Sequence, residues 1–351
     1  MSDNESLPGI HRSDIEHWIA NNSESLIPPF EWTRLEGGHS NLTYKIVDSE
    51  GTSAIVRRPP LGKLLPKAHD MGREFRILES LKETAVPVPN PIAYCEDIEI
   101  TGTHFYVMAS VTGRALYEAE DVRGFISELN REALGVSFID VLADLHKLEP
   151  DAIGLGRLGR PDAYVARQLK RWYDSWNSSR EAADIDLPEV DDLYEFLSTR
   201  IPDQEPGRIV HGDYGLHNCL ASPEGFVTAV LDWEISTLGD PLADLGYALN
   251  TWSEPGETLT LKDDAPTEEP GFSKRTALLE RYALRSKRDV SNISFYSAFN
   301  FWKTACIVQG VYARYVLGQK STEGIDLDYL RERIFRAARL ASNAADTIKT
   351  S

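Results

Sequence analysis

Cysteine is scarce in this sequence. Only Cys95, Cys219 and Cys306 occur among 351 residues. Their wide spacing and odd number match neither a disulfide framework nor a cysteine-based metal motif. We therefore expect a protein of the reducing cytoplasm.

Long apolar runs and an excess of basic charge are also missing. No stretch approaches the roughly 20 apolar residues that span a bilayer, and the first five residues, MSDNE, are acidic where a secretory signal would be basic. Lys and Arg total 37 against 55 Asp and Glu, a formal net charge of −18. Nucleic-acid binding depends on neutralising phosphates, so this balance argues against such a partner. An acidic surface would suit a cationic substrate, but solubility alone explains it.

One stretch carries most of the chemical information. Residues 209–220 read IVHGDYGLHNCL, and a turn signal, SPEG at 222–225, separates them from the β-rich run FVTAVL at 226–231. This pattern predicts a strand, a loop, a short strand, a turn and a further strand that ends at Asp232-Trp233-Glu234.

The polar residues of this stretch suit a metal–phosphate reaction. Asn218 and Asp232 offer hard oxygen ligands to Mg²⁺, which binds through one or two carboxylates together with substrate phosphates. Asp213 lies outside that pair and is free to accept a proton from a hydroxyl group. Kinases divide the work of phosphoryl transfer in the same way.

The spacing His211-Gly-Asp213-x4-Asn218, followed by Asp232-Trp233-Glu234, resembles the aminoglycoside phosphotransferase and choline kinase-like family. The resemblance covers about residues 30 to 320. It implies an α+β, two-lobed protein-kinase-like fold, with an N-lobe at 1–108, a hinge at 109–113 and a mainly helical C-lobe at 114–351. It also implies Mg²⁺ and ATP, and a small-molecule hydroxyl as acceptor.

The same resemblance distributes the nucleotide-binding roles. Glycines let backbone amides approach phosphates, so the segment with Gly37, Gly38, Ser40 and Asn41 is expected to contact them. Kinases place a lysine on the third strand and pair it with a helix glutamate; here Arg57 and Glu74 stand at those positions, with Arg58 on the opposite face of the strand. Backbone groups of the hinge, at Ala109 and Val111, are expected to pair with adenine.

The remaining chain predicts a frame around these residues. Strands are expected at 31–35, 44–47, 52–58, 93–95 and 104–108, and helices at 13–20 (opened by a Ser13 capping box), 68–81, 138–146, 295–317 and 328–348. Asp240 is expected to cap a helix beginning at Pro241. Asp240, Asp244 and His211 should support the catalytic loop, and His146 should be structural. The acidic segment 253–271 predicts a mobile loop with little core, either a lid whose carboxylates attract amines or an idle surface loop.

The sequence does not identify the acceptor substrate. Arg57-Arg58-Pro59-Pro60, His69-Asp70, Arg73-Glu74 and Tyr106-Val107-Met108 resemble the kinase-like domain of acyl-CoA dehydrogenase fusion proteins and its bacterial relatives. An aminoglycoside, a hydroxyacyl-CoA and another metabolite alcohol all fit.

Two other function classes compete with the kinase hypothesis. A non-catalytic nucleotide-binding module would explain Arg57 as a sign of lost activity, although it would not need Asp213, Asn218 and Asp232 together. A metal hydrolase would use His211, Asp213 and His217, but no second His/Asp cluster offers further ligands.

Overall fold

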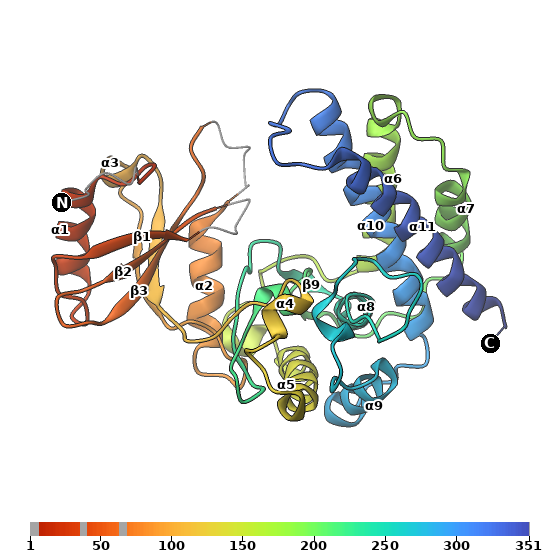
Figure 1. The fold of residues 1–351 in the computed structure, drawn as a ribbon, viewed down its shortest axis with the longest axis horizontal. Helices are drawn as coiled ribbons and strands as arrows, with labels where there is room; N and C mark the ends of the chain where they lie inside the picture. The colour runs from red at the N-terminus through yellow and green to blue at the C-terminus, as the bar shows by residue number, and fades with distance from the viewer. Residues whose placement is uncertain (1–6, 36–40, 63–68, 351) are drawn as a thin grey trace. The chain divides into compact units, whose positions relative to one another are not determined.

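The computed structural model describes residues 7–35, 41–62 and 69–350. Lys349 and Thr350 are described without their side chains. The chain forms two compact units (Figure 1). Unit 1 runs to Gly113 and also includes Thr228–Glu234; unit 2 comprises Arg114–Val227 and Ile235–Ser351. An antiparallel sheet forms the centre of unit 1 and helices form most of unit 2, which confirms the predicted α+β class.

Unit 1 contains a five-stranded sheet in which every neighbouring pair is antiparallel. Its strands, in spatial order, are β1 (Glu31–Leu35), β2 (Leu42–Val47), β3 (Ser53–Arg58), β5 (Phe105–Ala109) and β4 (Pro91–Cys95). The β2–β3 turn is closed by Asp48, whose carboxylate accepts the N–H groups of Glu50 and Thr52. Arg57 of β3 stands opposite Tyr106 of β5.

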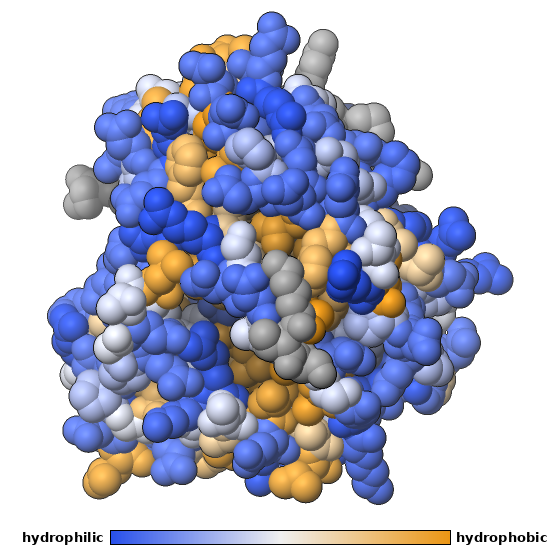
Figure 2. All heavy atoms as spheres, turned by 90° about the vertical axis from the view of Figure 1, so that its right-hand side faces the viewer, coloured by the Kyte–Doolittle hydropathy of each residue, from blue (hydrophilic) through white to orange (hydrophobic). Residues whose placement is uncertain are grey.

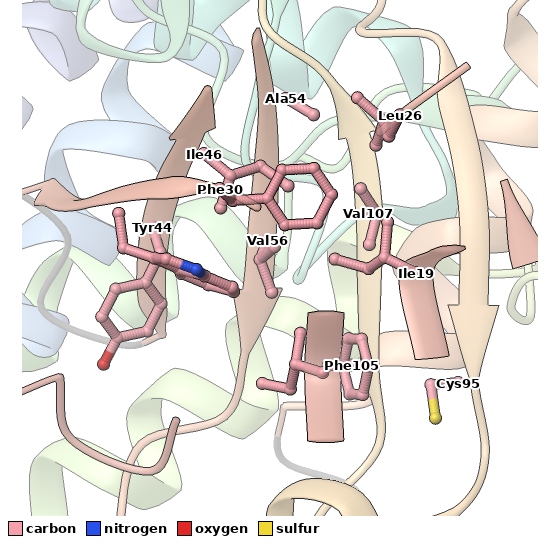
Figure 3. Close-up of a cluster of buried hydrophobic side chains, with 12 residues drawn as sticks. Ile19, Leu26, Phe30, Tyr44, Ile46, Ala54, Val56, Cys95, Phe105 and Val107 are labelled. Atoms are coloured by element: carbon pink, nitrogen blue, oxygen red, sulfur yellow. The ribbon is translucent and has the colours of Figure 1, made fainter. Parts of the chain in front are cut away.

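The two faces of this sheet have different neighbours, because side chains alternate along a strand. On one face, α1 (Arg12–Asn22) adds Ile15 and Ile19 to an apolar cluster with Val56 and Val107 (Figure 3). On the other face, α2 (Met71–Leu81) presents the buried Glu74 to the sheet. A short helix, α3 (Ile98–Thr101), precedes β5.

The predicted helix starts in unit 1 need correction. α1 begins at Arg12, and His11 is its N-cap without a side-chain hydrogen bond. Ser13 donates to Asp14 at 3.0 Å, so the predicted capping box is wrong. α2 begins at Met71, later than predicted, because the Asp70 carboxylate caps it by accepting the N–H of Arg73.

Unit 2 is built around α10 (Ile293–Val316), which packs mainly against α6 (Tyr164–Ala183), α8 (Pro241–Asn250) and α11 (Leu327–Thr350). Figure 1 shows α6, α10 and α11 side by side. The other helical elements are α4 (Ala119–Val122), α5 (Glu128–Lys147), η1 (Asp151–Ile153), α7 (Pro188–Ser198), η2 (Leu216–Asn218), η3 (Pro266–Glu268) and α9 (Arg275–Ser286).

Short strands surround the stretch that the sequence singled out. β6 (Arg208–Val210) precedes the predicted catalytic loop, and β7 (Cys219–Ala221) and β8 (Val227–Val230) follow it, as predicted. A further strand, β9 (Thr237–Gly239), pairs antiparallel with β6. It was not predicted, because three residues carry no recognisable alternation.

The prediction that 253–271 has little core is wrong. Ala265 and Thr267 of this segment are buried. The Thr267 hydroxyl donates to the Ser253 carbonyl at 2.8 Å, which closes the segment on itself. The segment is therefore a packed part of unit 2.

Hydrophilic residues cover most of the face shown in Figure 2, in keeping with the net charge of −18. Throughout the described ranges, no helix combines the length and the apolar composition that crossing a membrane requires.

Candidate active site

The loop after β6 turns at a glycine. Gly212 has φ of +88°, a region that favours glycine. A Cβ at this position would lie 3.2 Å from the Ile235 side chain, closer than ordinary packing allows. The turn between His211 and Asp213 therefore requires glycine.

The Asp213 carboxylate is held at both oxygens. Oδ2 accepts a hydrogen bond from Asn218 Nδ2 at 3.1 Å. Oδ1 accepts one from the Tyr247 hydroxyl and lies 3.4 Å from His217 Nε2. Burial raises the pKa of this carboxyl, but the contacts with His217 and Tyr247 outweigh burial and lower the pKa to about 2. Asp213 is thus ionised at neutral pH and fixed in orientation, while 37% of its side chain stays exposed to a ligand.

Asn218 ends η2 with its amide group oriented by the same loop. Nδ2 donates both to the Asp213 carboxylate and, at 2.9 Å, to the Asp213 carbonyl. Oδ1 accepts no hydrogen bond from any residue that the structure describes. A carbonyl-type oxygen in this state is a suitable ligand for Mg²⁺.

A buried carboxylate on α8 holds the loop from behind. Asp244 accepts the N–H of His211 through Oδ2 and that of Gly212 through Oδ1, the latter at 2.8 Å. His146 Nε2 lies 3.5 Å from the same carboxylate, and His146 Nδ1 bonds the Tyr282 hydroxyl at 2.7 Å. Burial lowers the pKa of His146 in spite of Asp244. His146 has a structural place in the fold, as predicted.

His211 contacts the loop directly, whereas Asp240 contacts α8 and Tyr296. The buried His211 accepts the Asp213 N–H at Nδ1, at 3.3 Å. Asp240 caps α8 by accepting the N–H of Leu242 at 3.0 Å, as predicted, and accepts the Tyr296 hydroxyl at 2.6 Å.

A pocket of about 280 Å³ opens beside Asp213 within unit 2. Its polar lining includes Asp213, His217, Lys262 and Arg333. Its apolar walls come from Phe138 of α5, Leu216 of η2, three residues of the segment 253–271, and two residues outside these elements: Leu261, Ala265 and Pro266, and Leu116 and Trp252. A small, partly apolar molecule bound in this pocket would lie within reach of the Asp213 carboxylate.

Unit 1 contains a second charged centre, around Arg57. Arg57 Nη2 donates to Asp232 Oδ1 at 2.7 Å. Arg57 Nε lies 3.1 Å from Glu74 Oε2, without an aligned hydrogen bond, and the Tyr106 hydroxyl donates to the same oxygen at 3.0 Å. Burial raises the pKa of Glu74, although Arg57 and Tyr106 oppose this shift. The predicted pair of Arg57 and Glu74 is thus in contact, with Asp232 as a third member.

Asp232 has the features of a functional carboxylate. It follows β8 with φ of +61°, an uncommon conformation for a residue other than glycine, which proteins often retain at functional sites. Its Oδ1 binds Arg57, and its Oδ2 has no partner among the described residues. About 31% of the side chain is exposed, so this oxygen is open to a cation.

Asn41 is engaged at both ends of its amide group. Nδ2 donates to Glu74 at 3.3 Å and to Glu234 at 3.4 Å, while Oδ1 bonds His69 Nδ1 at 2.9 Å. Its side chain therefore braces unit 1, and its predicted contact with a phosphate would require a rearrangement. Gly37, Gly38 and Ser40 lie outside the described residues.

The predicted hinge residues differ in their backbone bonding. The Ala109 N–H donates to the Asn90 carbonyl at 2.8 Å and is occupied. The Val111 N–H has no protein partner in the described ranges. Of the two, Val111 is the one with an N–H left for an adenine edge.

Comparison with known proteins decides the family. The model of the phosphotransferase enzyme family matches residues 31–276. The chain belongs to this family. A Ralstonia eutropha protein provisionally named an aminoglycoside phosphotransferase is 31% identical in sequence and has a structure that matches with a TM-score of 0.78, over 94% of this phosphotransferase and 98% of the relative. The predicted family and kinase-like fold are confirmed.

Two further relatives have names that bear on the chemistry of this phosphotransferase. Acyl-CoA dehydrogenase family member 11 from Rattus norvegicus is 37% identical over 298 residues, which are 83% of this chain but only 37% of that protein. The ADP-bound aminoglycoside phosphotransferase APH(2'')-Ib shares the fold at 14% identity, with a TM-score of 0.57 over 95% of this chain and 99% of its own.

The sequence of this phosphotransferase did not indicate Tyr247 or Arg333 as residues near Asp213. Tyr247 follows Asp240 and Asp244 at helical spacing, so the capped start of α8 could have placed it on the loop-facing side. Arg333 comes from α11, far along the chain, and no local pattern pointed to it.

Tyr247→Phe should lower kcat by about 10- to 100-fold, because a hydrogen bond to a charged group is worth ~1.5–3 kcal/mol. It should also raise the pKa of Asp213 from about 2 toward 3.8. Since the folded-state pKa lies below 3.8, this carboxylate stabilises the fold above that pH and loses the contribution as the pH falls from 3.8 toward 2; in the variant this contribution should be smaller, and its loss should be complete at a higher pH. Turnover at neutral pH and acid unfolding curves measure both effects. Tyr173→Phe, which removes a 3.0 Å bond to Asp191, is the matched control and should leave both unchanged.

Arg57→Met should lower the free energy of unfolding of unit 1 by about 3–5 kcal/mol, because it leaves Glu74 buried without its cation. Arg57→Lys should restore much of this, since a lysine keeps the charge but loses the two-sided contact with Glu74 and Asp232. Urea unfolding measures the difference. Arg34→Met, at an exposed position on β1, is the control. An equal loss of unfolding free energy in this variant would mean that the ion pair of Arg57 is not the cause of the effect.

Proposed function

We propose that this chain is a small-molecule kinase that transfers the γ-phosphate of ATP to a hydroxyl group. The observation that carries this proposal is the Asp213 carboxylate, ionised and fixed at the edge of a pocket in a member of the phosphotransferase family. The ADP-bound structure of a protein with the same fold supports a nucleotide as the donor.

In the proposed mechanism, the acceptor hydroxyl donates a hydrogen bond to Asp213. A carboxylate with a pKa of about 2 is a weak base, so it orients the hydroxyl and takes the proton only as the new O–P bond forms. The bond between the γ-phosphorus and the β–γ bridging oxygen breaks, and ADP leaves. A loose transition state of this kind depends mainly on positioning.

The donor set suits Mg²⁺. Asn218 and Asp232 are the predicted ligands, and each carries a side-chain oxygen, Oδ1 of Asn218 and Oδ2 of Asp232, that lacks a protein partner among the described residues. When bound, Mg²⁺ would neutralise charge on the phosphates. Arg57 and the Val111 N–H are assigned to the nucleotide, as are the predicted Gly37, Gly38 and Ser40.

The pocket favours a metabolite alcohol over an aminoglycoside as the acceptor. Asp213 is its only carboxylate lining residue among those described, whereas a polyamine would need several. Likeness to acyl-CoA dehydrogenase family member 11 supports a hydroxyacyl-CoA as one such alcohol.

The two competing classes have less support. A binding-only module has no use for an oriented Asp213 together with the open oxygens of Asn218 and Asp232. For a metal hydrolase, the described residues offer no group of three or more His, Cys, Asp or Glu that could hold an ion.

The test is mass-spectrometric detection of phosphate transfer from Mg·ATP to a panel of aminoglycosides, amino alcohols and hydroxyacyl-CoAs. A product that is absent with Asp213→Asn would establish the kinase. Mg·ATP binding without any product would favour the binding module.

A further inference from the structure

The pocket beside Asp213 is basic in an acidic protein. The chain carries a net charge of −18, yet the charged lining of this pocket comprises one carboxylate, Asp213, and two basic side chains, Lys262 and Arg333. The local charge is therefore opposite to that of the whole molecule.

Arg333 has no counter-ion in the described structure. It projects from α11, its Nε is buried without a hydrogen-bond partner, and no carboxylate of the described residues lies within 4.0 Å of its guanidinium. Its recorded neighbour is the ring of Tyr329, 5.9 Å from the guanidinium carbon. Burying part of an unpaired guanidinium costs free energy, which an anionic ligand in the pocket would offset.

Lys262 is fixed by protein groups. Its Nζ donates to the Tyr117 carbonyl at 2.7 Å and lies 3.7 Å from Glu118. This anchoring holds one positive charge at the pocket wall, although 39% of the Lys262 side chain is exposed.

The acidic residues of the segment 253–271 contribute no charge to the lining of the pocket. Their carboxylates pair instead with arginines: Glu254 and Glu257 with Arg275, Asp263 with Arg336, Asp264 with Arg123, and Glu269 with Arg123 and Arg131. None of the acidic residues of this segment lines the pocket. The expectation that this segment attracts amines to the acceptor site is not supported by this arrangement.

We propose that Arg333, together with Lys262, forms an anion subsite in the acceptor pocket, and that the acceptor is a hydroxy compound with an apolar body and a negatively charged carboxylate or phosphate group. This inference rests on the proposed kinase function. Guanidinium groups match the planar geometry of carboxylate and phosphate oxygens, and the walls formed by Phe138 and Trp252 match the apolar body. A polycationic aminoglycoside would meet two like charges beside Asp213.

Matched acceptors test the subsite: a hydroxy carboxylate, its neutral methylamide, an amino alcohol of the same chain length, and the CoA thioester of the hydroxy acid. We expect kcat/KM to be highest for the hydroxy carboxylate or for the CoA thioester. A higher value for the carboxylate would mean that the subsite binds a carboxylate, and a higher value for the thioester would mean that it binds the phosphates of CoA. Arg333→Gln should raise KM for the anionic acceptor by about 10- to 100-fold and leave KM for ATP and turnover of the methylamide unchanged. Arg333→Lys should recover part of the loss, and the exposed Arg339→Gln on α11 is the control.

A preference for the amino alcohol, an equal loss for the neutral methylamide, or a rise in KM for ATP in place of the acceptor would each overturn the subsite. Calorimetric binding of the hydroxy acids separates this proposal from the kinase function. If no acceptor is phosphorylated, the kinase proposal fails, while binding that Arg333→Gln abolishes would still establish the subsite and absent binding would overturn it.

Discussion

Asp213→Asn should lower kcat for phosphate transfer by about 10²- to 10⁴-fold, the usual contribution of a positioned acid–base group. An asparagine keeps the size of the side chain and can still accept from Tyr247, but it cannot take a proton from the acceptor. Binding of Mg·ATP should change little, because the nucleotide roles are assigned to other residues. Product formation followed by mass spectrometry, and nucleotide affinity measured by calorimetry, separate the two quantities.

Asp174→Asn is the matched control for this experiment. Asp174 is an exposed residue of α6 whose partner is Lys170, so the same chemical change there should leave turnover intact. Loss of Mg·ATP binding in Asp213→Asn would contradict the role assigned to Asp213, and so would full retention of turnover.

The predictable part of the site is the part that local sequence determines. Period-two alternation along β3 places Arg57 and Arg58 on opposite faces: Arg57 meets Glu74, while the buried Arg58 bonds the carbonyls of Gly9 and Pro59. The spacing from Asp213 to Asn218 fits a single loop, in which the two side chains bond each other. The strand alternation and the loop spacing need only neighbouring residues, which is why the sequence revealed them, whereas the pairing of Arg57 with Glu74 was expected from the resemblance to kinases.

Long-range packing determines the rest. Tyr247 reaches Asp213 across 34 positions of sequence, and Arg333 reaches the same pocket from the last helix. No strand or helix pattern encodes which distant side chain will face a given carboxylate.

The segment 253–271 shows how composition misleads. Its Pro, Thr and Glu content is typical of exposed loops, but Leu261, Ala265 and Thr267 anchor it in unit 2. Its carboxylates pair with Arg123 after α4, Arg131 of α5 and Arg336 of α11, which lie far away in sequence, and with Arg275 of α9, which follows the segment. The average composition of the segment reveals neither its buried residues nor its ion pairs.

Asp244→Ala should lower the free energy of unfolding of unit 2 by about 3–5 kcal/mol and abolish turnover. The alanine leaves the N–H groups of His211 and Gly212 buried or half-buried without an acceptor, and each such group costs ~1–3 kcal/mol. Because Gly212 directly precedes Asp213, the loop that orients the carboxylate would lose its anchor. Asp244→Asn keeps one acceptor oxygen and should fall between the wild type and the alanine variant.

Urea unfolding and steady-state kinetics of the same variants distinguish a stability effect from a positioning effect. Asp174→Ala, which removes only an exposed ion pair, should cost at most about 1 kcal/mol. If Asp244 orients Asp213, the Asp244→Asn variant should show a reduced kcat and a nearly unchanged KM for ATP. It must be assayed under conditions where it is fully folded. Normal turnover in the folded Asn variant would instead mean that Asp244 stabilises α8 and its surroundings without orienting Asp213.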